Sequence, residues 1–204
     1  MPSPIIGLTG PTGAGKSEAA HIMRTMGGAI IDADEAARRV VESPDCLAAL
    51  KDAFGADICA EGFLDRHELA RRAFVDTAHT QLLNDITHPR ILTQIRAQIR
   101  LSQAKGAPFV VLDAPLLYES GLDEECNAVF VVLADPELRL RRICARDGIS
   151  EADARQRMAA QQSDEYYADG ATAIFHNNGD MAALEKALHS AISGLRLEWS
   201  RYAR

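Results

Sequence analysis

The residues from Gly10 to Ser17 read G-P-T-G-A-G-K-S and fit the pattern G-x-x-x-x-G-K-[ST]. They follow Ile5–Thr9, a short apolar run typical of a buried strand, and they precede Glu18–Met26, where apolar residues recur at helical spacing. This order of strand, glycine-rich loop and helix predicts a phosphate-binding P-loop. Glycines let backbone N–H groups turn inward around phosphate oxygens, and the helix N-terminus adds partial positive charge. A glycine-rich turn without a ligand is the alternative interpretation.

Within this loop two side chains have distinct expected roles. We expect Lys16 to reach the β- and γ-phosphates of a nucleotide and Ser17 to hold Mg²⁺. The phosphate-binding set predicted from the segment is Gly13, Ala14, Gly15, Lys16, Ser17 and Glu18.

The composition is that of a globular chain of 204 residues, with 47% hydrophobic and 25% charged residues. No apolar run approaches the ~18 residues of a membrane span and no signal peptide is evident, so we expect a cytoplasmic protein without a membrane partner. The net charge of −7 argues against nucleic acid as a partner. The four cysteines, which we expect to be reduced thiols rather than zinc ligands or disulfides, are Cys46, Cys59, Cys126 and Cys144.

Strand-like and helical patterns alternate along the chain, which predicts an α/β fold with a parallel sheet. The predicted strands are Ile5–Thr9, Ala29–Asp32, Phe109–Asp113, Val129–Ala134 and Ala171–Phe175. No strand signal appears between the second and third of them. That stretch instead contains helical patterns over Asp45–Phe54, Asp65–Val75 and Thr77–Lys105, the last broken at Pro89. It therefore predicts a helical side domain inserted into the sheet domain.

Acidic residues end two of the predicted strands. Asp32 and Asp34 close the second strand and Asp113 closes the third. Because the carboxyl ends of parallel strands meet at the edge where the P-loop lies, we expect these carboxylates near bound phosphate. Asp34 could orient a hydroxyl nucleophile and accept its proton, or it could cap the helix predicted over 35–41. Asp113 could face Mg²⁺ or start a turn, and Glu119 in the following loop is a candidate substrate contact.

A helix predicted over 136–147 carries a row of arginines. Arg139, Arg142 and Arg146 fall at i, i+3 and i+7 and therefore share one face. A second helix opens with the capping-box pattern Ser150-x-x-Asp153. Two helices joined by a short turn, one bearing an arginine row, indicate a lid that closes over phosphate and excludes water, with a solvated helix face as the alternative.

Seven segments taken together resemble the dephospho-CoA kinase family. They are Gly10–Ser17, Ile31 to Asp34, Leu64-Asp65-Arg66, His88-Pro89-Arg90-Ile91, Asp113 to Glu119, Arg142 to Gly148 and Asn177-Asn178-Gly179. The P-loop alone is shared with many unrelated nucleotide-binding families. The I-D-A-D, H-P-x-I and P-L-L-x-E segments in this order are much more particular, and the resemblance covers the chain from about Ile5 to Gly179.

This resemblance implies transfer of the ATP γ-phosphate to the ribose 3′-hydroxyl of dephospho-CoA, the last step of coenzyme A biosynthesis, with Mg²⁺ as cofactor. It implies a P-loop kinase fold with a nucleotide-binding core at 1–34 and 106–204, a helical CoA-substrate domain at 35–105 and a lid at 136–163. The implied catalytic residues are Asp34, Lys16, Arg142 and Arg146. Asn177, Asn178 and Gly179 would border the ATP adenine. The implied contacts of the acceptor substrate are Asp34, Arg66, His88, Leu116 and Glu119, and those of the metal are Ser17 and Asp113.

Two positions depart from the usual pattern. Glu18 stands where many P-loop kinases have a Thr that contacts the α-phosphate, and His176 stands where an acid often precedes N-N-G.

Two other classes of protein compete with the kinase interpretation. A GTP-driven switch would need N-K-x-D, which does not occur, and its only D-x-x-G, Asp52 to Gly55, lies in a helical stretch. A nucleoside monophosphate kinase would share the fold and the lid but differ in the helical domain.

Overall fold

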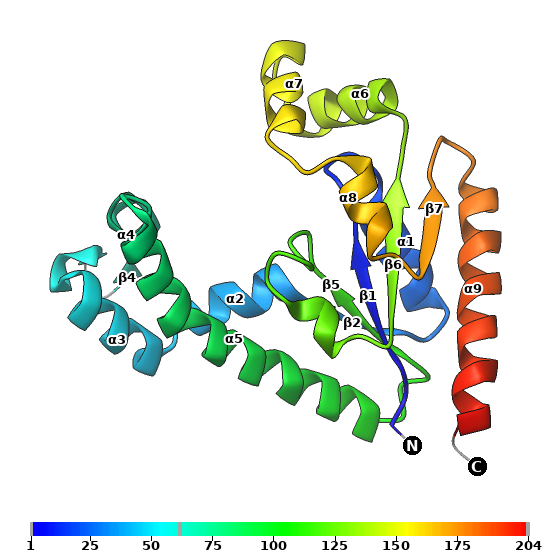
Figure 1. Ribbon diagram of the computed structural model, residues 1–204, viewed down its shortest axis with the longest axis horizontal. Coiled ribbons are helices and arrows are strands. Elements are labelled where there is room, and N and C mark those ends of the chain that lie inside the picture. Colours follow the sequence, from blue (N-terminus) through cyan, green and yellow to red (C-terminus); the bar gives the residue numbers. More distant parts are fainter. Residues whose placement is uncertain (1, 61–62, 203–204) are drawn as a thin grey trace. The chain divides into compact units, whose positions relative to one another are not determined.

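The computed structural model describes residues 2–60 and 63–202, and the chain divides into two compact units (Figure 1). The sheet unit comprises residues 1–31 and 101–204, and the helical unit comprises residues 32–100. In chain order the helical unit therefore lies between the second and third strands of the sheet.

Five strands form the sheet in the order β2-β5-β1-β6-β7. They are β1 (Ile5–Thr9), β2 (Ala29–Asp32), β5 (Val110–Asp113), β6 (Ala128–Leu133) and β7 (Ala173–His176). β1 pairs in parallel with β5, where Ile5 lies opposite Val110, and with β6, where Ile6 lies opposite Ala128. β6 and β7 are parallel as well. The predicted α/β class with a five-stranded parallel sheet is confirmed, and each predicted strand lies within one or two residues of the observed one.

The main core lies between the sheet and two helices, α1 (Lys16–Thr25) and α9 (Met181–Tyr202). Side chains alternate along a strand, so Ile6 and Leu8 of β1 face this core together, and both are fully buried. Leu188 of α9 joins the same cluster. Fully burying such a side chain stabilises the fold by roughly 1.5–3 kcal/mol.

After β6 the chain forms three helices that return it to β7. They are α6 (Pro136–Asp147), α7 (Glu151–Ala159) and α8 (Asp164–Asp169). α6 ends at Gly148, which adopts a left-handed conformation with φ of 65°, and α7 begins where Ser150 Oγ accepts the Asp153 N–H at 3.2 Å. Both boundaries match the prediction. The α6–α7 hairpin has a small core of its own, made of Leu140, Ile143 and Ala154 with partly buried neighbours.

The helical unit is built from short helices around a smaller core. Its elements are α2 (Ala33–Val41), α3 (Pro44–Phe54), the 3-10 turn η1 (Ala56–Ile58), β3 (Cys59–Ala60), β4 (Phe63–Leu64), α4 (Arg66–Ala73) and α5 (Thr77–Ala104), which runs on past residue 100. Its buried residues are Val40, Cys46, Leu50, Phe54, Ile58, Leu69 and Ala73.

Two expectations for this region are wrong. The sequence suggested no strand here, yet β3 and β4 pair as an antiparallel hairpin; segments of two residues are too short to show a strand period. The sequence also predicted a break at Pro89, yet α5 continues through it. Pro89 removes one donor, but Asp85, four residues earlier, is exposed, so water can satisfy its carbonyl. The Arg90 guanidinium also donates to the Ile86 carbonyl at 2.6 Å, which supports the neighbouring turn.

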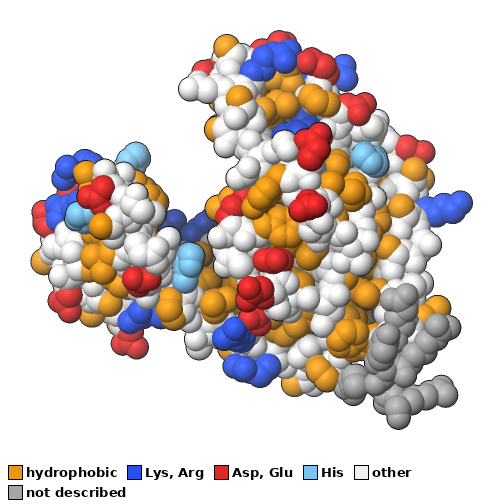
Figure 2. Space-filling view, in the orientation of Figure 1, with side chains coloured by type: hydrophobic (Ala, Val, Ile, Leu, Met, Phe, Trp, Pro, Cys, Tyr) orange, Lys and Arg blue, Asp and Glu red, His pale blue; other side chains and the backbone are white. Residues whose placement is uncertain are grey.

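Charges of both signs are interspersed on the surface. On the face shown in Figure 2, acidic and basic side chains mix over α6–α7 and over the helical unit, so neither region presents there a broad surface of one sign. All four cysteines are free thiols. Among the described residues, no helix is long and apolar enough to span a membrane.

Candidate active site

The P-loop connects β1 to α1, and its three glycines have backbone conformations that other residues rarely adopt. Gly10, Gly13 and Gly15 have φ of 146°, 79° and 97°. A Cβ at Gly10 would lie 2.2 Å from the Val132 carbonyl oxygen, and one at Gly15 would lie 1.9 Å from Asn177 Nδ2. The loop thus needs glycine both for its turn and for close approach to β6 and to the segment after β7.

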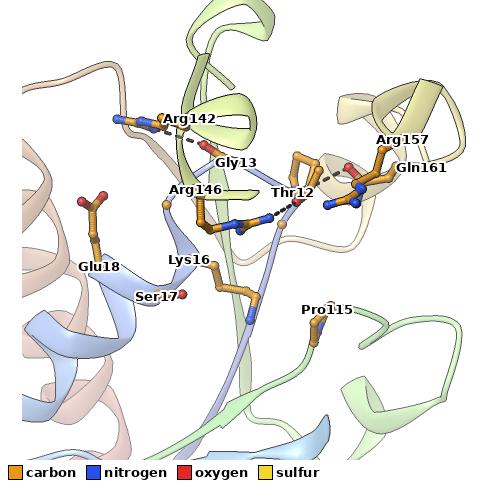
Figure 3. A pocket seen from close by; sticks show the side chains of 14 residues that line it. Thr12, Gly13, Lys16, Ser17, Glu18, Pro115, Arg142, Arg146, Arg157 and Gln161 are labelled. Carbon is orange, nitrogen blue, oxygen red and sulfur yellow. Dashed lines mark hydrogen bonds between the residues drawn. The ribbon is translucent and has the colours of Figure 1, made fainter. Parts of the chain in front are cut away.

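The P-loop forms one wall of a cleft of about 820 Å³ within the sheet unit. The opposite wall comes from the α6–α7 hairpin, and Pro115 lies at the floor (Figure 3). The residues that line the cleft are Gly10, Pro11, Thr12, Gly13, Gly15, Lys16, Ser17, Glu18, Pro115, Arg142, Ala145, Arg146, Arg157 and Gln161. The structure therefore brings together most of the phosphate-binding set and both arginines predicted for the lid.

Lys16 and Asp113 form an ion pair at the carboxyl edge of the sheet. Their side chains are 18% and 15% exposed, so the pair is largely shielded from water. The prediction placed Lys16 on phosphate and Asp113 on a metal. Because the two side chains touch, both reach the same point. There a bound phosphate could replace Asp113 as the partner of Lys16, and a metal ion could replace Lys16 as the partner of Asp113.

Arg142 lies over the back of the P-loop. Its guanidinium donates to the carbonyls of Gly13 at 3.3 Å and Ala14 at 3.4 Å, and to the Asn177 carbonyl at 3.1 Å. A cation thereby holds carbonyl groups of the loop, whereas the groups of a P-loop that face a bound phosphate are its backbone N–H groups. Arg142 is thus placed to stabilise the loop as well as to line the cleft.

Arg146 and Arg157 approach the cleft from α6 and α7 and converge beside Thr12 (Figure 3). Asp147 lies between them: Arg146 Nε donates to it at 2.7 Å, and Arg157 forms an ion pair with it. The hydrogen bond from Arg146, aided by Arg157, lowers the pKa of Asp147. Our sequence reasoning missed Arg157 and Asp147. Arg157 lies three residues after the buried Ala154 and next to the partly buried Met158, and that helical spacing is the signal that could have found it.

The segment after β7 reaches the P-loop through Asn177. Asn177 is 1% exposed, and its Nδ2 donates to the Ala14 carbonyl at 3.1 Å and to Glu18 Oε2 at 3.0 Å. Asn178 Oδ1 accepts the Asp135 N–H at 2.9 Å, which ties the segment to the start of α6. Gly179, with φ of 114°, completes the turn that Asn-Gly predicts. Side-chain contact between adenine and Asn177 would require these hydrogen bonds to break.

Glu18 uses both its polar groups within the protein. Its backbone N–H donates to the Gly15 carbonyl at 3.1 Å, and its carboxylate accepts from Asn177. The backbone N–H of Glu18, which could otherwise take the place of the missing Thr hydroxyl, is therefore engaged in the first turn of α1.

The loop after β5 begins close to the P-loop and then turns away from the cleft. The Thr9 hydroxyl donates to the Pro115 carbonyl at 3.2 Å. Leu117 is buried, whereas Leu116 and Glu119 are exposed. Neither Leu116 nor Glu119 lines the cleft.

The remaining predicted residues belong to the helical unit. Asp32 is the N-cap of α2, because its Oδ1 accepts the Glu35 N–H at 2.9 Å. The capping alternative for Asp34 is therefore wrong: Asp34 lies exposed in the first turn of α2. Arg66 Nη2 pairs with Glu42 Oε1 at 2.6 Å, and His88 is exposed on α5.

A groove of about 420 Å³ lies within the helical unit. Its lining residues come from α2, α3 and α5 and are Arg39, Val40, Ser43, Asp45, Pro89, Arg90, Thr93 and Gln94. The residues next to His88 thus contribute to the groove, whereas His88 and Arg66 do not.

Comparison with known proteins identifies the family. A sequence profile described as dephospho-CoA kinase matches residues 4–183. The chain belongs to the dephospho-CoA kinase family. It is 42% identical over 190 residues to a dephospho-CoA kinase of Corynebacterium glutamicum, which covers 92% of this chain and 97% of that one. It is 43% identical over 192 residues to a dephospho-CoA kinase of Deinococcus radiodurans, covering 94% and 92% of the two chains.

A solved structure shares the fold of this chain. The crystal structure of TT1252 from Thermus thermophilus superposes with a TM-score of 0.81 at 34% identity, covering 96% of this chain and 99% of that one. The resemblance found in the sequence motifs is therefore confirmed, and membership of the family makes the chain an ATP-dependent kinase.

Proposed function

We propose that this chain transfers the γ-phosphate of ATP to the ribose 3′-hydroxyl of dephospho-CoA, giving coenzyme A and ADP. The observation that carries the proposal is the single cleft in which the P-loop, Lys16 and the arginines of α6–α7 converge, in a chain of this family. Phosphoryl transfer needs positioning and charge stabilisation more than covalent chemistry. A cleft lined by backbone donors and several cations supplies both.

In this proposal the sheet unit binds ATP. P-loop N–H groups and Lys16 hold the β- and γ-phosphates, and Asn177, Asn178 and Gly179 border the adenine side through the segment that they hold in place. The α6–α7 hairpin, residues 136–163, is the lid. Arg142 and Arg146, joined by Arg157, stabilise the charge that spreads over the transferring group. The helical unit binds the CoA substrate, with Arg66 and His88 as candidate contacts, and Leu116 and Glu119 of the sheet unit are further candidates.

Asp34 is the proposed partner of the acceptor hydroxyl. The 3′-oxygen forms a bond to the γ-phosphorus, the bond from that phosphorus to the β–γ bridging oxygen breaks, and the hydroxyl proton passes to the Asp34 carboxylate. An exposed carboxylate in the first turn of α2, with the cap supplied by Asp32, is free to meet a hydroxyl. Positioning of the nucleophile contributes more than basicity here, because the transition state is loose.

Magnesium would enter with the nucleotide. Among the described residues, no group of three or more His, Cys, Asp or Glu side chains could hold a metal ion. The Ser17 hydroxyl and the Asp113 carboxylate are hard oxygen donors that fit Mg²⁺, which commonly keeps waters and binds substrate phosphates in its other positions. When bound, the ion neutralises charge on the β- and γ-phosphate oxygens.

Free thiols at all four cysteines also accord with a reducing, cytoplasmic location.

One coupled assay tests the proposal against a nucleoside monophosphate kinase. Purified protein and Mg-ATP are given dephospho-CoA, AMP, CMP or pantetheine, and ADP and the phosphorylated product are measured together. We expect turnover with dephospho-CoA alone. Turnover with AMP or CMP and none with dephospho-CoA would overturn the proposed acceptor and leave the kinase fold intact.

A further inference from the structure

One arginine of the predicted row has no place in the proposed chemistry. Arg139, on the first turn of α6, is buried, with a side chain only 7% exposed, and it does not line the cleft. Burial lowers the pKa of Arg139, which measures the cost of keeping a cation there. A buried charge persists where its hydrogen-bonding groups are satisfied, so its partners indicate what the position is for.

The partners of Arg139 come from two segments that are distant in sequence. Its Nε donates to the Thr12 carbonyl of the P-loop at 3.0 Å. Its Nη1 pairs with Asp164 Oδ1 at 3.2 Å, and its Nη2 donates to Gln161 Oε1 at 3.3 Å. One guanidinium therefore joins the P-loop, the start of α6 and the segment that leaves α7.

Gln161 closes the same network on the other side of Thr12. The Thr12 N–H donates to Gln161 Oε1 at 3.0 Å (Figure 3). Both backbone polar groups of Thr12 therefore bond to side chains of this network. Thr12 is thus held by these two side chains while the N–H groups that follow it in the loop bind phosphate. The neighbouring Gly13 packs against the same turn, where a Cβ would lie 2.8 Å from the Arg139 carbonyl oxygen.

The network around Thr12 joins the two ends of the α6–α7 hairpin. Arg139 precedes the hairpin core and Gln161 follows it, so both ends of the α6–α7 hairpin meet at Thr12. Arg142, Arg146 and Arg157 all lie between these two ends. Because the hairpin has its own core, we expect its arginines to behave as one body, so that their register on the phosphate site depends on where the hairpin joins the P-loop.

We propose that Arg139, with Gln161 and Asp164, is a positioning residue that sets the register of the hairpin arginines on the P-loop. The proposal rests on the proposed function of the cleft and adds a residue to it. A displacement of about 1 Å at a phosphoryl-transfer site can cost on the order of 10²-fold in rate. An effect of Arg139 on turnover would therefore come through Arg142, Arg146 and Arg157, without contact to the substrate.

The test compares Arg139→Met with a matched control, Arg155→Met. Arg155 also joins α6 and α7, through Glu137 at 3.1 Å, but its side chain is 55% exposed and it has no contact with the P-loop among the described residues. We expect Arg139→Met to lower kcat about 10- to 100-fold, with KM for dephospho-CoA within about twofold, and to raise the ratio of ADP formed to CoA formed. Arg139→Lys, which keeps the charge, should recover part of kcat. Arg155→Met should match the wild type in both measurements.

Hydrogen exchange separates positioning from a purely structural role and requires no acceptor. ATP should protect amides of α6–α7 in the wild type and in Arg155→Met, and much less in Arg139→Met measured at saturating ATP. A folded Arg139→Met protein with normal kcat, normal coupling and normal ATP protection, changed only in melting temperature, would overturn the proposal. If Arg139→Met does not fold, Gln161→Leu is held to the same outcomes. Failure of the wild type to phosphorylate dephospho-CoA would overturn the proposed function alone, because the exchange experiment still tests Arg139.

Discussion

The two units of the chain place their functional groups by different means. In the sheet unit, buried parallel strands fix where the P-loop, Asp113 and the start of α6 leave the sheet, so phosphate-binding groups follow from backbone geometry. In the helical unit, a small core is supplemented by surface ion pairs around Arg72, which bonds both Glu68 and Asp57. Changes in the sheet unit should therefore act mainly on chemistry. Changes in the helical unit should act on acceptor positioning or on local stability.

The largest effect is expected at Lys16. Lys16→Ala removes the cation that meets the β- and γ-phosphates, so turnover should be abolished and ATP affinity strongly weakened. Wild-type protein gains about 2.7 kcal/mol of stability at ATP concentrations a hundredfold above the dissociation constant. Thermal melts with and without Mg-ATP should show that the mutant gains much less.

Lys105→Ala is the matched control, because Lys105 is exposed at the end of α5 and does not line the cleft. It should keep the full ATP-induced shift. An equal shift in the Lys16→Ala protein would remove Lys16 from the phosphate site.

Asp34 carries the corresponding prediction for the helical unit. Asp34→Asn should spare ATP affinity and lower kcat with dephospho-CoA by roughly 10²- to 10⁴-fold, nearer the lower end, as for a positioned general base. Since Asp32 supplies the cap, the fold should lose only the attraction of one carboxylate to the helix N-terminus, about 0.3–1 kcal/mol. Steady-state kinetics and the melting temperature are measured on the same preparation.

Glu35→Gln removes a charge from the same helical turn and serves as the control. It should match the wild type in kcat, and its melting temperature should fall slightly more than that of Asp34→Asn because it also loses the ion pair with Arg39. Normal kinetics in a folded Asp34→Asn protein would refute the catalytic role of Asp34.

The sequence could predict the sheet unit closely because its signals are local. The order of strand, glycine-rich loop and helix, the five apolar runs, and the boundaries of α6 and α7 each depend on a few consecutive residues, and each matches the structure. The helical unit was predicted less well. The strands β3 and β4 are too short to show a strand period. Pro89 is tolerated within α5 because water can reach Asp85, whose carbonyl loses its helical hydrogen bond.

Side-chain roles were harder to predict than elements. Arg139, Arg142 and Arg146 share a helix face, as spacing predicts, yet one is buried, one holds P-loop carbonyls and one is exposed beside Asp147. The burial of Arg139 depends on its contacts with Thr12 and Asp164, and both of these residues are distant in sequence from the turn of α6 that carries Arg139. Helical spacing says which side chains share a face and nothing about what that face meets.

An intermediate effect is expected from the arginines in the cleft. Arg142→Ala should lower kcat about 10²-fold and Arg146→Ala about tenfold, each by more than it raises KM for ATP, because these cations act mainly as charge moves in the transition state. Arg142 has the larger role because it also holds the Gly13 and Ala14 carbonyls. Arg141 is exposed and does not line the cleft, so Arg141→Ala should match the wild type. An equally damaging Arg141→Ala would contradict this assignment of the helix face.

The smallest effect concerns the ion pairs of the helical unit and appears only in acid. Hydrogen bonds from Arg72 lower the pKa of Asp57 from 3.8 to about 2, and those from Arg71 and Arg72 lower the pKa of Glu68 from 4.5 to about 2. A carboxyl whose pKa is lower in the folded than in the unfolded state stabilises the fold above the unfolded value, and this contribution is lost as the pH falls toward the folded value. The helical unit should therefore lose stability between about pH 4.5 and pH 2.

Arg72→Met should reduce this pH dependence unequally at the two carboxylates. Asp57 loses its principal partner, so its pKa should return close to the ordinary value. Glu68 keeps Arg71, whose Nε donates to it at 2.8 Å, so its pKa should rise only in part. Carboxyl NMR titration of both residues, with the exposed Arg38→Met as control, measures the difference directly. Because exposed ion pairs are screened by water and salt, the change in stability at neutral pH should be small and kcat should not change. Equal pKa values for Asp57 in the wild type and in Arg72→Met would mean that Arg72 does not organise the surface of this unit.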